Sequence, residues 1–386
     1  MIRRFFYGWL AMASAWIICT CLYVLIIVQA VKLFMDLASI DSQELGIRFD
    51  IFLTTESLIM QAALFGLFFG TLFFFINIFF DRSIINKQAF GRILLIKSLL
   101  YFVALVLVTL FVSTLMKSVG YYPQYITLVA STESLLQYFF LGVAPFFTIL
   151  ILLMNLLMLV TRKFGIGLLL SLFTGKYHQP ISEERIFMFI DLRSSTTYAE
   201  QLGHIRYSKL IQDCFFVLNE IVDKYHGTIY QYVGDEAVVT WPVKHGLRKA
   251  RCLEMFFAYV NKIKSRSPKY LDRFGLVPEF KAGAHIGTVT AAEVGDIKRE
   301  IAYHGDTLNT AARVQSLCNS YQSELLVTKD LLERIVLPKE LKARPMGKTE
   351  LKGKLNMVEI YALYQSDKPG QIIEQSQPKI YRPDEV

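Results

Sequence analysis

The stretch RIFMFIDLRSST, residues 185–196, decides the fold of the C-terminal half of this 386-residue chain. Its apolar run from Ile186 to Ile190 predicts a buried strand, and that strand ends at an acid, Asp191. Small hydroxyl residues follow, and then a helical pattern begins. A carboxylate at a strand end can hold Mg²⁺, and the free N–H groups of a helix start can hold phosphate oxygens. The stretch therefore favours phosphate chemistry, with a simple helix cap at Asp191 as the alternative.

A second acid lies at the tip of a predicted hairpin, IYQYVGDEAVVTW, residues 229–241. Gly234 and Asp235 form its turn, because a glycine next to an aspartate between two apolar runs is a strong hairpin signal. An aspartate held at this tip can join Asp191 around a metal ion. The alternative is an ordinary turn residue.

With both acids in view, residues 182–365 resemble the catalytic domain of class III nucleotidyl cyclases, the adenylate and guanylate cyclase family. The family's F-x-D strand end is matched by residues 189–191, and its G-D hairpin by residues 234–235. HGDTLNTAARVQ, residues 304–315, is similar to the family's G-x-T-x-N-x-A-x-R helix, and LKGK, residues 351–354, to its late K-G-K motif. The four motifs stand in the family's order, and the set is specific although each motif alone is weak.

The resemblance implies a role for each motif. Two Mg²⁺ or Mn²⁺ ions per site are expected at Asp191, Leu192 and Asp235. Asn309 would position the ribose of a nucleoside triphosphate, and Arg313 would stabilise charge on its α-phosphate. The expected substrate-binding positions are Leu192, Arg193, Ser194, Ser195, Gln231, Ala302 and Lys352.

The same resemblance implies a symmetric homodimer. In this family the metal-binding carboxylates come from one protomer, and the helix with the asparagine and arginine comes from the other. A chain with one domain that carries all the parts would then form two sites at the interface between two copies.

The positions that read the base depart from the family. Adenylate cyclases usually have a lysine and an aspartate or threonine where this chain has Gln231 and Ala302, and the glutamate and cysteine of guanylate cyclases are absent too. The favoured function is a membrane-bound bacterial-type cyclase that converts ATP to 3′,5′-cyclic AMP and pyrophosphate. The alternatives are a cyclase for GTP or a pyrimidine nucleotide, and a catalytically silent nucleotide-binding signalling module.

The first 160 residues read as a membrane domain. Hydrophobic residues make up 53% of the chain, its mean hydropathy is +0.38, and the apolar excess lies in this part. Four segments reach the roughly 20 apolar residues that a bilayer crossing requires. They are Trp9–Val31, Leu58–Phe80, Ile93–Met116 and Leu136–Val160. A signal peptide is the alternative for the first, but its apolar stretch is too long for one and no small-residue cleavage site follows it.

The charges between the spans predict the orientation. Arginines and lysines precede the first span, fill the second loop and follow the fourth span, whereas the other loops carry mainly acids. The positive-inside rule then places both termini and the catalytic domain in the cytoplasm, at the inner (plasma) membrane. Membrane anchoring and phosphate binding account for the net charge of +8, so no nucleic acid partner is expected.

The predicted fold is a four-span α-helical membrane domain followed by an α+β, ferredoxin-like cyclase domain. The boundaries are 1–160 for the membrane domain, 161–181 for a linker, 182–365 for the catalytic domain and 366–386 for a disordered tail. Within the catalytic domain, apolar patterns predict separate strands at Phe280–Ile286 and Thr288–Val294 and a helix at Gly305–Asn319.

Overall fold

The structure is a computed structural model, and it describes seven stretches of the chain. These are residues 2–37, 55–82, 90–118, 144–164, 174–296, 299–351 and 357–366. The chain divides into two compact units, Met1–Leu169 and Leu170–Val386, and each is considered by itself.

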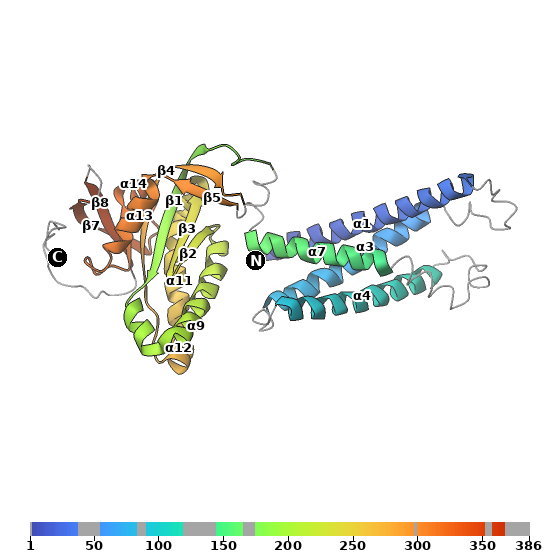
Figure 1. Ribbon diagram of the computed structural model, residues 1–386, viewed down its shortest axis with the longest axis horizontal. Helices are drawn as coiled ribbons and strands as arrows, with labels where there is room; N and C mark the ends of the chain where they lie inside the picture. The colour runs from blue at the N-terminus through green and yellow to red at the C-terminus, as the bar shows by residue number, and fades with distance from the viewer. Residues whose placement is uncertain are drawn as a thin grey trace. The chain divides into compact units, whose positions relative to one another are not determined.

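The first unit contains four described helices. They are α1 (Ile2–Leu37), α3 (Thr55–Arg82), α4 (Phe90–Ser118) and α7 (Ala144–Phe164) (Figure 1). Their shared core is aromatic, with Trp16 of α1 in edge contact with Phe69 of α3 and stacked on Phe147 of α7. Gly66 and Gly70 let α3 approach the backbone of α1, since a β-carbon at Gly66 would lie 2.6 Å from the α-carbon of Ile17.

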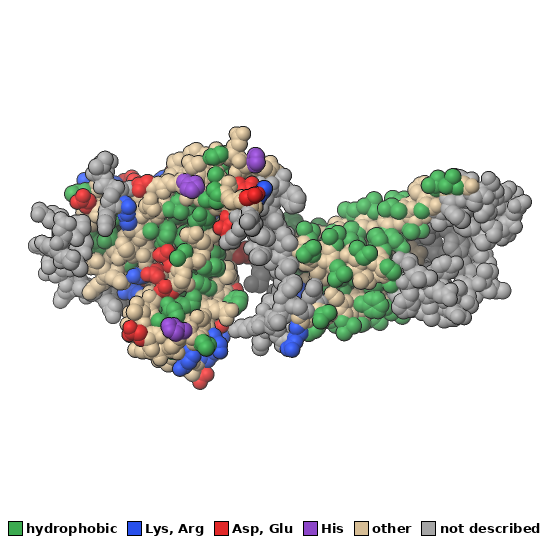
Figure 2. All heavy atoms as spheres, in the orientation of Figure 1, with side chains coloured by type: hydrophobic (Ala, Val, Ile, Leu, Met, Phe, Trp, Pro, Cys, Tyr) green, Lys and Arg blue, Asp and Glu red, His purple; other side chains and the backbone are tan. Residues whose placement is uncertain are grey.

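Three of these helices are long and apolar enough to cross a membrane. Their candidate spans are Phe6–Ile27, Ile59–Phe80 and Leu95–Val112. The fourth predicted span is described only from Ala144, where an apolar stretch runs to Met158, and residues 136–143 lie outside the described part. Large apolar side chains cover the visible outer surface of this unit (Figure 2), which is typical of helices that face lipid.

The second unit is built on an eight-stranded sheet. Its strands are β1 (Ile181–Leu192), β2 (Thr228–Val233), β3 (Glu236–Pro242), β4 (Phe280–Val294), β5 (Glu300–His304), β6 (Leu325–Thr328), β7 (Leu341–Thr349) and β8 (Val358–Gln365). The strand order is β2-β3-β1-β4-β6-β8-β7, and β5 pairs with β4. The β4–β6 pair is parallel and the other pairs are antiparallel, which confirms the α+β prediction.

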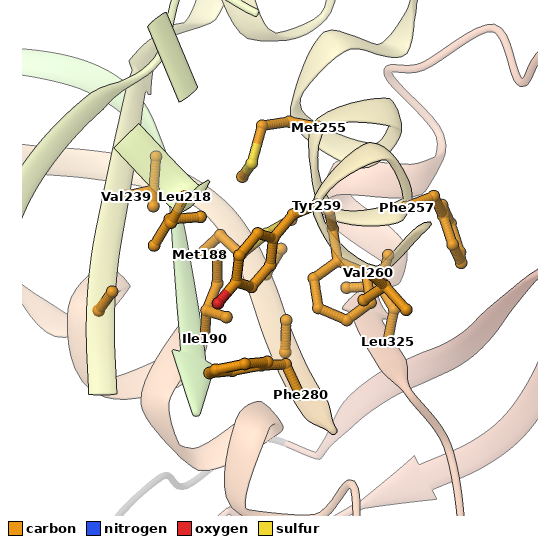
Figure 3. Close-up of a cluster of buried hydrophobic side chains, with 14 of the residues drawn as sticks. Met188, Ile190, Leu218, Val239, Met255, Phe257, Tyr259, Val260, Phe280 and Leu325 are labelled. Carbon is orange, nitrogen blue, oxygen red and sulfur yellow. The ribbon is translucent and has the colours of Figure 1, made fainter. Parts of the chain in front are cut away.

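Helices cover both faces of this sheet. They are α9 (Ser195–Lys224), α10 (Val243–Gly246), the short η3 (Arg248–Ala250), α11 (Arg251–Ser265), α12 (Ser267–Phe274), α13 (Asp306–Ser316) and α14 (Lys329–Leu332). Side chains alternate along β1, so Met188 and Ile190 join the core under α9 and α11, while Phe187 and Phe189 join the one under α13. Figure 3 shows the first core, where Tyr259 of α11 lies against Met188 and Phe280.

Two strands predicted at 280–286 and 288–294 are a single strand, β4, and that prediction is wrong. Gly287 is extended rather than turned, and it faces α13, where a β-carbon would lie 2.6 Å from the hydroxyl oxygen of Thr307. The glycine therefore marks a close helix contact and not a chain reversal. The sequence reading also missed β5, β7 and α12, which are short or lack a regular apolar pattern.

Candidate active site

Asp191 lies at the end of β1 on the face that α13 covers. Two side chains hold its carboxylate: the amide nitrogen of Gln315 donates to Oδ2 at 2.9 Å, and the Lys281 ammonium lies 3.3 Å from the same oxygen. Burial raises the pKa of Asp191, Lys281 opposes this, and the charge of Asp235 adds to it. The carboxylate is thus crowded by a second acid and partly neutralised by one cation.

Asp235 occupies the tip of the β2–β3 hairpin, as predicted from the sequence. Gly234 takes φ of 60°, a left-handed conformation that favours glycine at this turn. The register pairs Ile190 with Ala237, so the hairpin tip lies beside the end of β1. The fold therefore brings the two expected metal-binding aspartates to one place.

Glu236 is a third acid at this place, and the sequence reading did not single it out. Burial and then the charges of Asp191 and Asp235 raise its pKa to about 7, against the effect of Lys281. Its only sequence signal was its position next to Asp235 in the hairpin turn. Three neighbouring carboxylates with a single lysine repel one another, and a bound cation would relieve that repulsion.

The residues present fit a divalent metal ion. In the described part of the chain, no cluster of three or more His, Cys, Asp or Glu side chains forms a complete metal cage. Two carboxylates at a strand end suit Mg²⁺, which keeps several waters and takes phosphate oxygens from a substrate. Asp191 and Asp235 would hold it, together with the backbone at Leu192.

The residues of the loop after Asp191 are not equally available to bind phosphate. The Arg193 amide donates to the carbonyl of Glu279 at 2.8 Å, and its guanidinium donates to the carbonyl of Ser323 at 2.7 Å. This expected substrate contact is therefore engaged inside the domain, and it fastens the loop to its neighbours. Ser194 and Ser195 lie at the start of α9, and Ser194 takes a left-handed conformation with φ of 54°. Their backbone amides are better placed than that of Arg193 to receive phosphate oxygens.

Asn309 and Arg313 lie on α13 away from the aspartates of their own chain. Among the described residues, no hydrogen bond or ion pair joins either of them to Asp191 or Asp235. Asn309 is exposed. The Nη1 atom of Arg313 is buried and has no partner in the described part, although buried guanidinium groups normally donate hydrogen bonds. A buried donor without a partner fits a site in which a further group accepts its hydrogen bond.

The two expected base-reading positions lie on β2 and β5, which pair with β3 and β4 and not with each other. Gln231 is exposed on β2, next to a bulge, and Ala302 is half-buried on β5 opposite Ala292. The adjacent residues tie these strands together, because the rings of Tyr230 and Tyr303 lie edge to face with centroids 5.0 Å apart. Lys352, the expected ligand of the terminal phosphates, lies outside the described residues.

A groove of about 530 Å³ opens beside Asp235, between α9 and β2. Apolar side chains such as Ile211 and Phe215 form its walls. Tyr207, which the sequence did not single out, also lines it, together with Asp235. Burial, and next the charge of Asp235, raise the pKa of Tyr207 to about 12, so it stays a neutral phenol.

Comparison with known proteins identifies the domain that carries this site. A family model described as the adenylate and guanylate cyclase catalytic domain matches residues 177–365, so this part of the chain is a domain of the class III cyclase type. Members of the family generally use divalent metal ions.

Among curated proteins, adenylate cyclase 2 of Rhizobium meliloti (strain 1021) is 37% identical over 204 residues, which cover 53% of this chain. Adenylate cyclase 1 of the same organism is 27% identical over 190 residues, covering 46% of this chain. The chain spans 56% and 27% of the lengths of these relatives. The crystal structure of the adenylyl cyclase CyaB from P. aeruginosa aligns with a TM-score of 0.43 at 22% identity, covering 49% of this chain and 98% of that one.

Proposed function

We propose that this chain is a membrane-anchored nucleotidyl cyclase that converts ATP to 3′,5′-cyclic AMP and pyrophosphate. The observation that carries the proposal is the pair of carboxylates, Asp191 and Asp235, brought together beside Lys281 in a domain of the cyclase family. The choice of ATP is supported by the two relatives named adenylate cyclase.

The reaction requires the ribose 3′-hydroxyl to lose its proton and its oxygen to bond to the α-phosphorus. The bond from that phosphorus to the bridging oxygen then breaks, and pyrophosphate leaves with the electron pair. Two Mg²⁺ or Mn²⁺ ions held by Asp191 and Asp235 would acidify the hydroxyl and neutralise the phosphates. The Lys281 ammonium adds positive charge there, and the amides of Ser194 and Ser195 can receive phosphate oxygens.

Asn309 and Arg313 serve the site of a second copy in this proposal. The buried, unpaired Nη1 of Arg313 supports it, because a guanidinium pairs strongly with a phosphate. The lack of contact between this arginine and Asp191 of its own chain supports it as well. Two copies related by a twofold axis would give two complete sites, with Arg313 stabilising the α-phosphate and Asn309 positioning the ribose. Lys352 would bind the terminal phosphates.

Gln231 would contact the base. Its amide carries a donor and an acceptor in one plane, which matches N1 and the N6 amino group of adenine. The amide can also rotate to match guanine or uracil, and Ala302 offers no polar atom to discriminate. GTP or a pyrimidine nucleotide is therefore the second candidate substrate, and this exposed glutamine is the observation that favours it.

The apolar helices of the first unit would anchor the enzyme in the plasma membrane with both termini in the cytoplasm. A reporter that is active only outside the cytoplasm should stay silent when it is fused after Thr161 and work when it is fused near Asp41. The opposite pattern would contradict this topology. We assign residues 1–160 to the membrane domain, 161–181 to a linker, 182–365 to catalysis and 366–386 to a tail.

The direct test is product analysis. The full-length protein in detergent would be incubated with Mn²⁺ and each of the four nucleoside triphosphates, and the products identified by mass spectrometry. We expect cyclic AMP and pyrophosphate as the main products. Strict use of another nucleotide would overturn the choice of ATP, and no product from any of the four would favour the silent signalling module.

A further inference from the structure

Gln315 is the one side chain of α13 that reaches a metal-binding aspartate of its own chain. Its Nε2 atom donates to Asp191 Oδ2 at 2.9 Å, and the residue is 6% exposed. Arg313 stands two positions earlier on the same helix, so the two side chains point about 200° apart around the axis. One helix therefore presents Gln315 to one place and Arg313 to another.

The packing of α13 on β4 fixes the position of Gln315. Gly283 of β4 faces the helix, and a β-carbon there would lie 2.1 Å from the backbone nitrogen of Gln315. Gly283 pairs with Phe189 of β1, and the next pair on the same face of the sheet is Lys281 with Asp191. The backbone of α13 therefore contacts the sheet two residues along β1 from Asp191, on the same face of the sheet. In this packing Gln315 lies close enough to donate its hydrogen bond to Asp191.

The amide of Gln315 has a defined effect on the carboxylate. It donates to Oδ2, the oxygen that also faces the Lys281 ammonium, and so both donors hold the same oxygen. Oδ1 then remains the oxygen that is free of these two contacts. An outer hydrogen bond of this kind orients a carboxylate for a metal ion, and its loss typically weakens metal affinity about 10-fold to 100-fold.

We infer that Gln315 is a positioning residue for the metal-binding carboxylate of its own chain, so that α13 serves two active sites at once. Its inner face orients Asp191 of the same copy, and its other face carries Asn309 and Arg313 to the second copy. The second half of this inference rests on the proposed function. The first half rests on the contact between Gln315 and Asp191 and on the proposed role of Asp191 as a metal ligand.

The first test measures metal binding without turnover. Gln315→Met keeps the length and volume of the side chain and removes its donor. Mn²⁺ binding to the full-length protein in detergent would be followed by the electron paramagnetic resonance signal of the free ion. We expect the dissociation constant to rise about 10-fold. The same substitution at Gln201, an exposed glutamine of α9, is the matched control and should leave Mn²⁺ binding unchanged.

An unchanged dissociation constant in a folded Gln315→Met protein would overturn the inference. If that variant does not fold, Gln315→Asn decides, because it keeps an amide on the helix but withdraws it by one methylene. We expect this variant to bind Mn²⁺ more weakly than the wild type, and equal binding would contradict the inference. Asn309→Ala should bind Mn²⁺ as well as the wild type, since it alters the other face of the helix.

The second test asks which site Gln315 serves. Two differently tagged full-length chains would be co-expressed, the heterodimers purified through both tags, and their activity measured at limiting Mn²⁺. Gln315→Met paired with Arg313→Ala leaves one site intact and should recover activity. Gln315→Met paired with Asp191→Asn damages both sites and should not.

The reverse pattern would show that Gln315 serves the second copy, and it would overturn the inference. The pair Asp191→Asn with Arg313→Ala is the reference for the shared site. If this reference pair fails to recover while Gln315→Met still weakens Mn²⁺ binding, the proposed interfacial site is wrong and the positioning role of Gln315 stands.

Discussion

Gly283 of β4 lies against the backbone of Gln315, and a β-carbon on this glycine would come within 2.1 Å of the Gln315 nitrogen. The obstacle is main chain, which cannot rotate away. Gly283→Ala should therefore push α13 off the sheet and cost about 1–3 kcal/mol of stability. Gly287→Ala is the graded control, because it meets the Thr307 side chain, which can shift. The melting temperature of the full chain should fall further for Gly283→Ala, and the reverse order would contradict this packing.

Asp191→Asn and Asp235→Asn should each abolish nearly all turnover, by about 100-fold or more, because each removes a negative charge that would hold a metal ion. Neither should unfold the domain, since an asparagine at position 191 can still accept the hydrogen bond from Gln315. Activity would be measured alongside circular dichroism. Turnover close to wild type with unchanged Mg²⁺ dependence in either variant would show that the carboxylates are not the metal ligands.

Glu184 and Arg334 form a two-pronged ion pair between β1 and the segment after α14, with Arg334 Nη2 at 3.0 Å from Oε2. The hydrogen bond from Arg334 lowers the pKa of Glu184 below its ordinary value. Since the folded state holds the ionised form, the stabilisation is present above pH 4.5 and fades as the pH falls below it. Both side chains are well exposed, so we expect only about 0.2–1 kcal/mol.

The check compares wild type with Glu184→Gln in chemical denaturation at pH 7 and pH 3.5. The difference in the free energy of unfolding should be present at pH 7 and shrink at pH 3.5. A difference that grows on acidification would mean that the ion pair does not favour the charged carboxylate.

Gln231 sets how the base is read in the proposed function. Gln231→Lys restores the residue usual in adenylate cyclases and should sharpen the preference for ATP over the other nucleotides. Gln231→Ala removes both hydrogen-bonding groups and should weaken turnover of every substrate. The ratio of kcat/KM between nucleotides measures this preference. A site rejects a wrong base more strongly when that base leaves a buried group unpaired. Equal ratios in all three proteins would remove Gln231 from base recognition.

The parts of the fold that the sequence predicted are those with strong local signals. The apolar run before Asp191 and the Gly234-Asp235 turn placed the first strand and the hairpin, and the apolar helices were evident from hydropathy. Gly287 led to the wrong prediction of two strands, because the sequence does not distinguish a glycine that lets a helix pack closely from a glycine that turns a strand. Only the packing of α13 distinguishes them.

The residues that surround Asp191 in the site could not be predicted from the sequence. Lys281 and Gln315 meet Asp191 across 90 and 124 positions of the chain, and no local pattern marks such contacts. Tyr207 and Glu236 were missed for a related reason, since a tyrosine on a helix and an acid after a turn are ordinary residues until the fold brings them together. Arg193 also fastens the loop to the distant carbonyl groups of Glu279 and Ser323, and no local pattern marks these contacts.

Mixing two inactive chains tests the central claim, a cyclase site shared between two copies, most directly. Asp191→Asn and Arg313→Ala should each be inactive as homodimers. In a purified heterodimer of full-length chains, one of the two sites keeps every residue, so about half of the wild-type cyclic AMP production should return. Failure to recover activity in proven heterodimers would contradict the account.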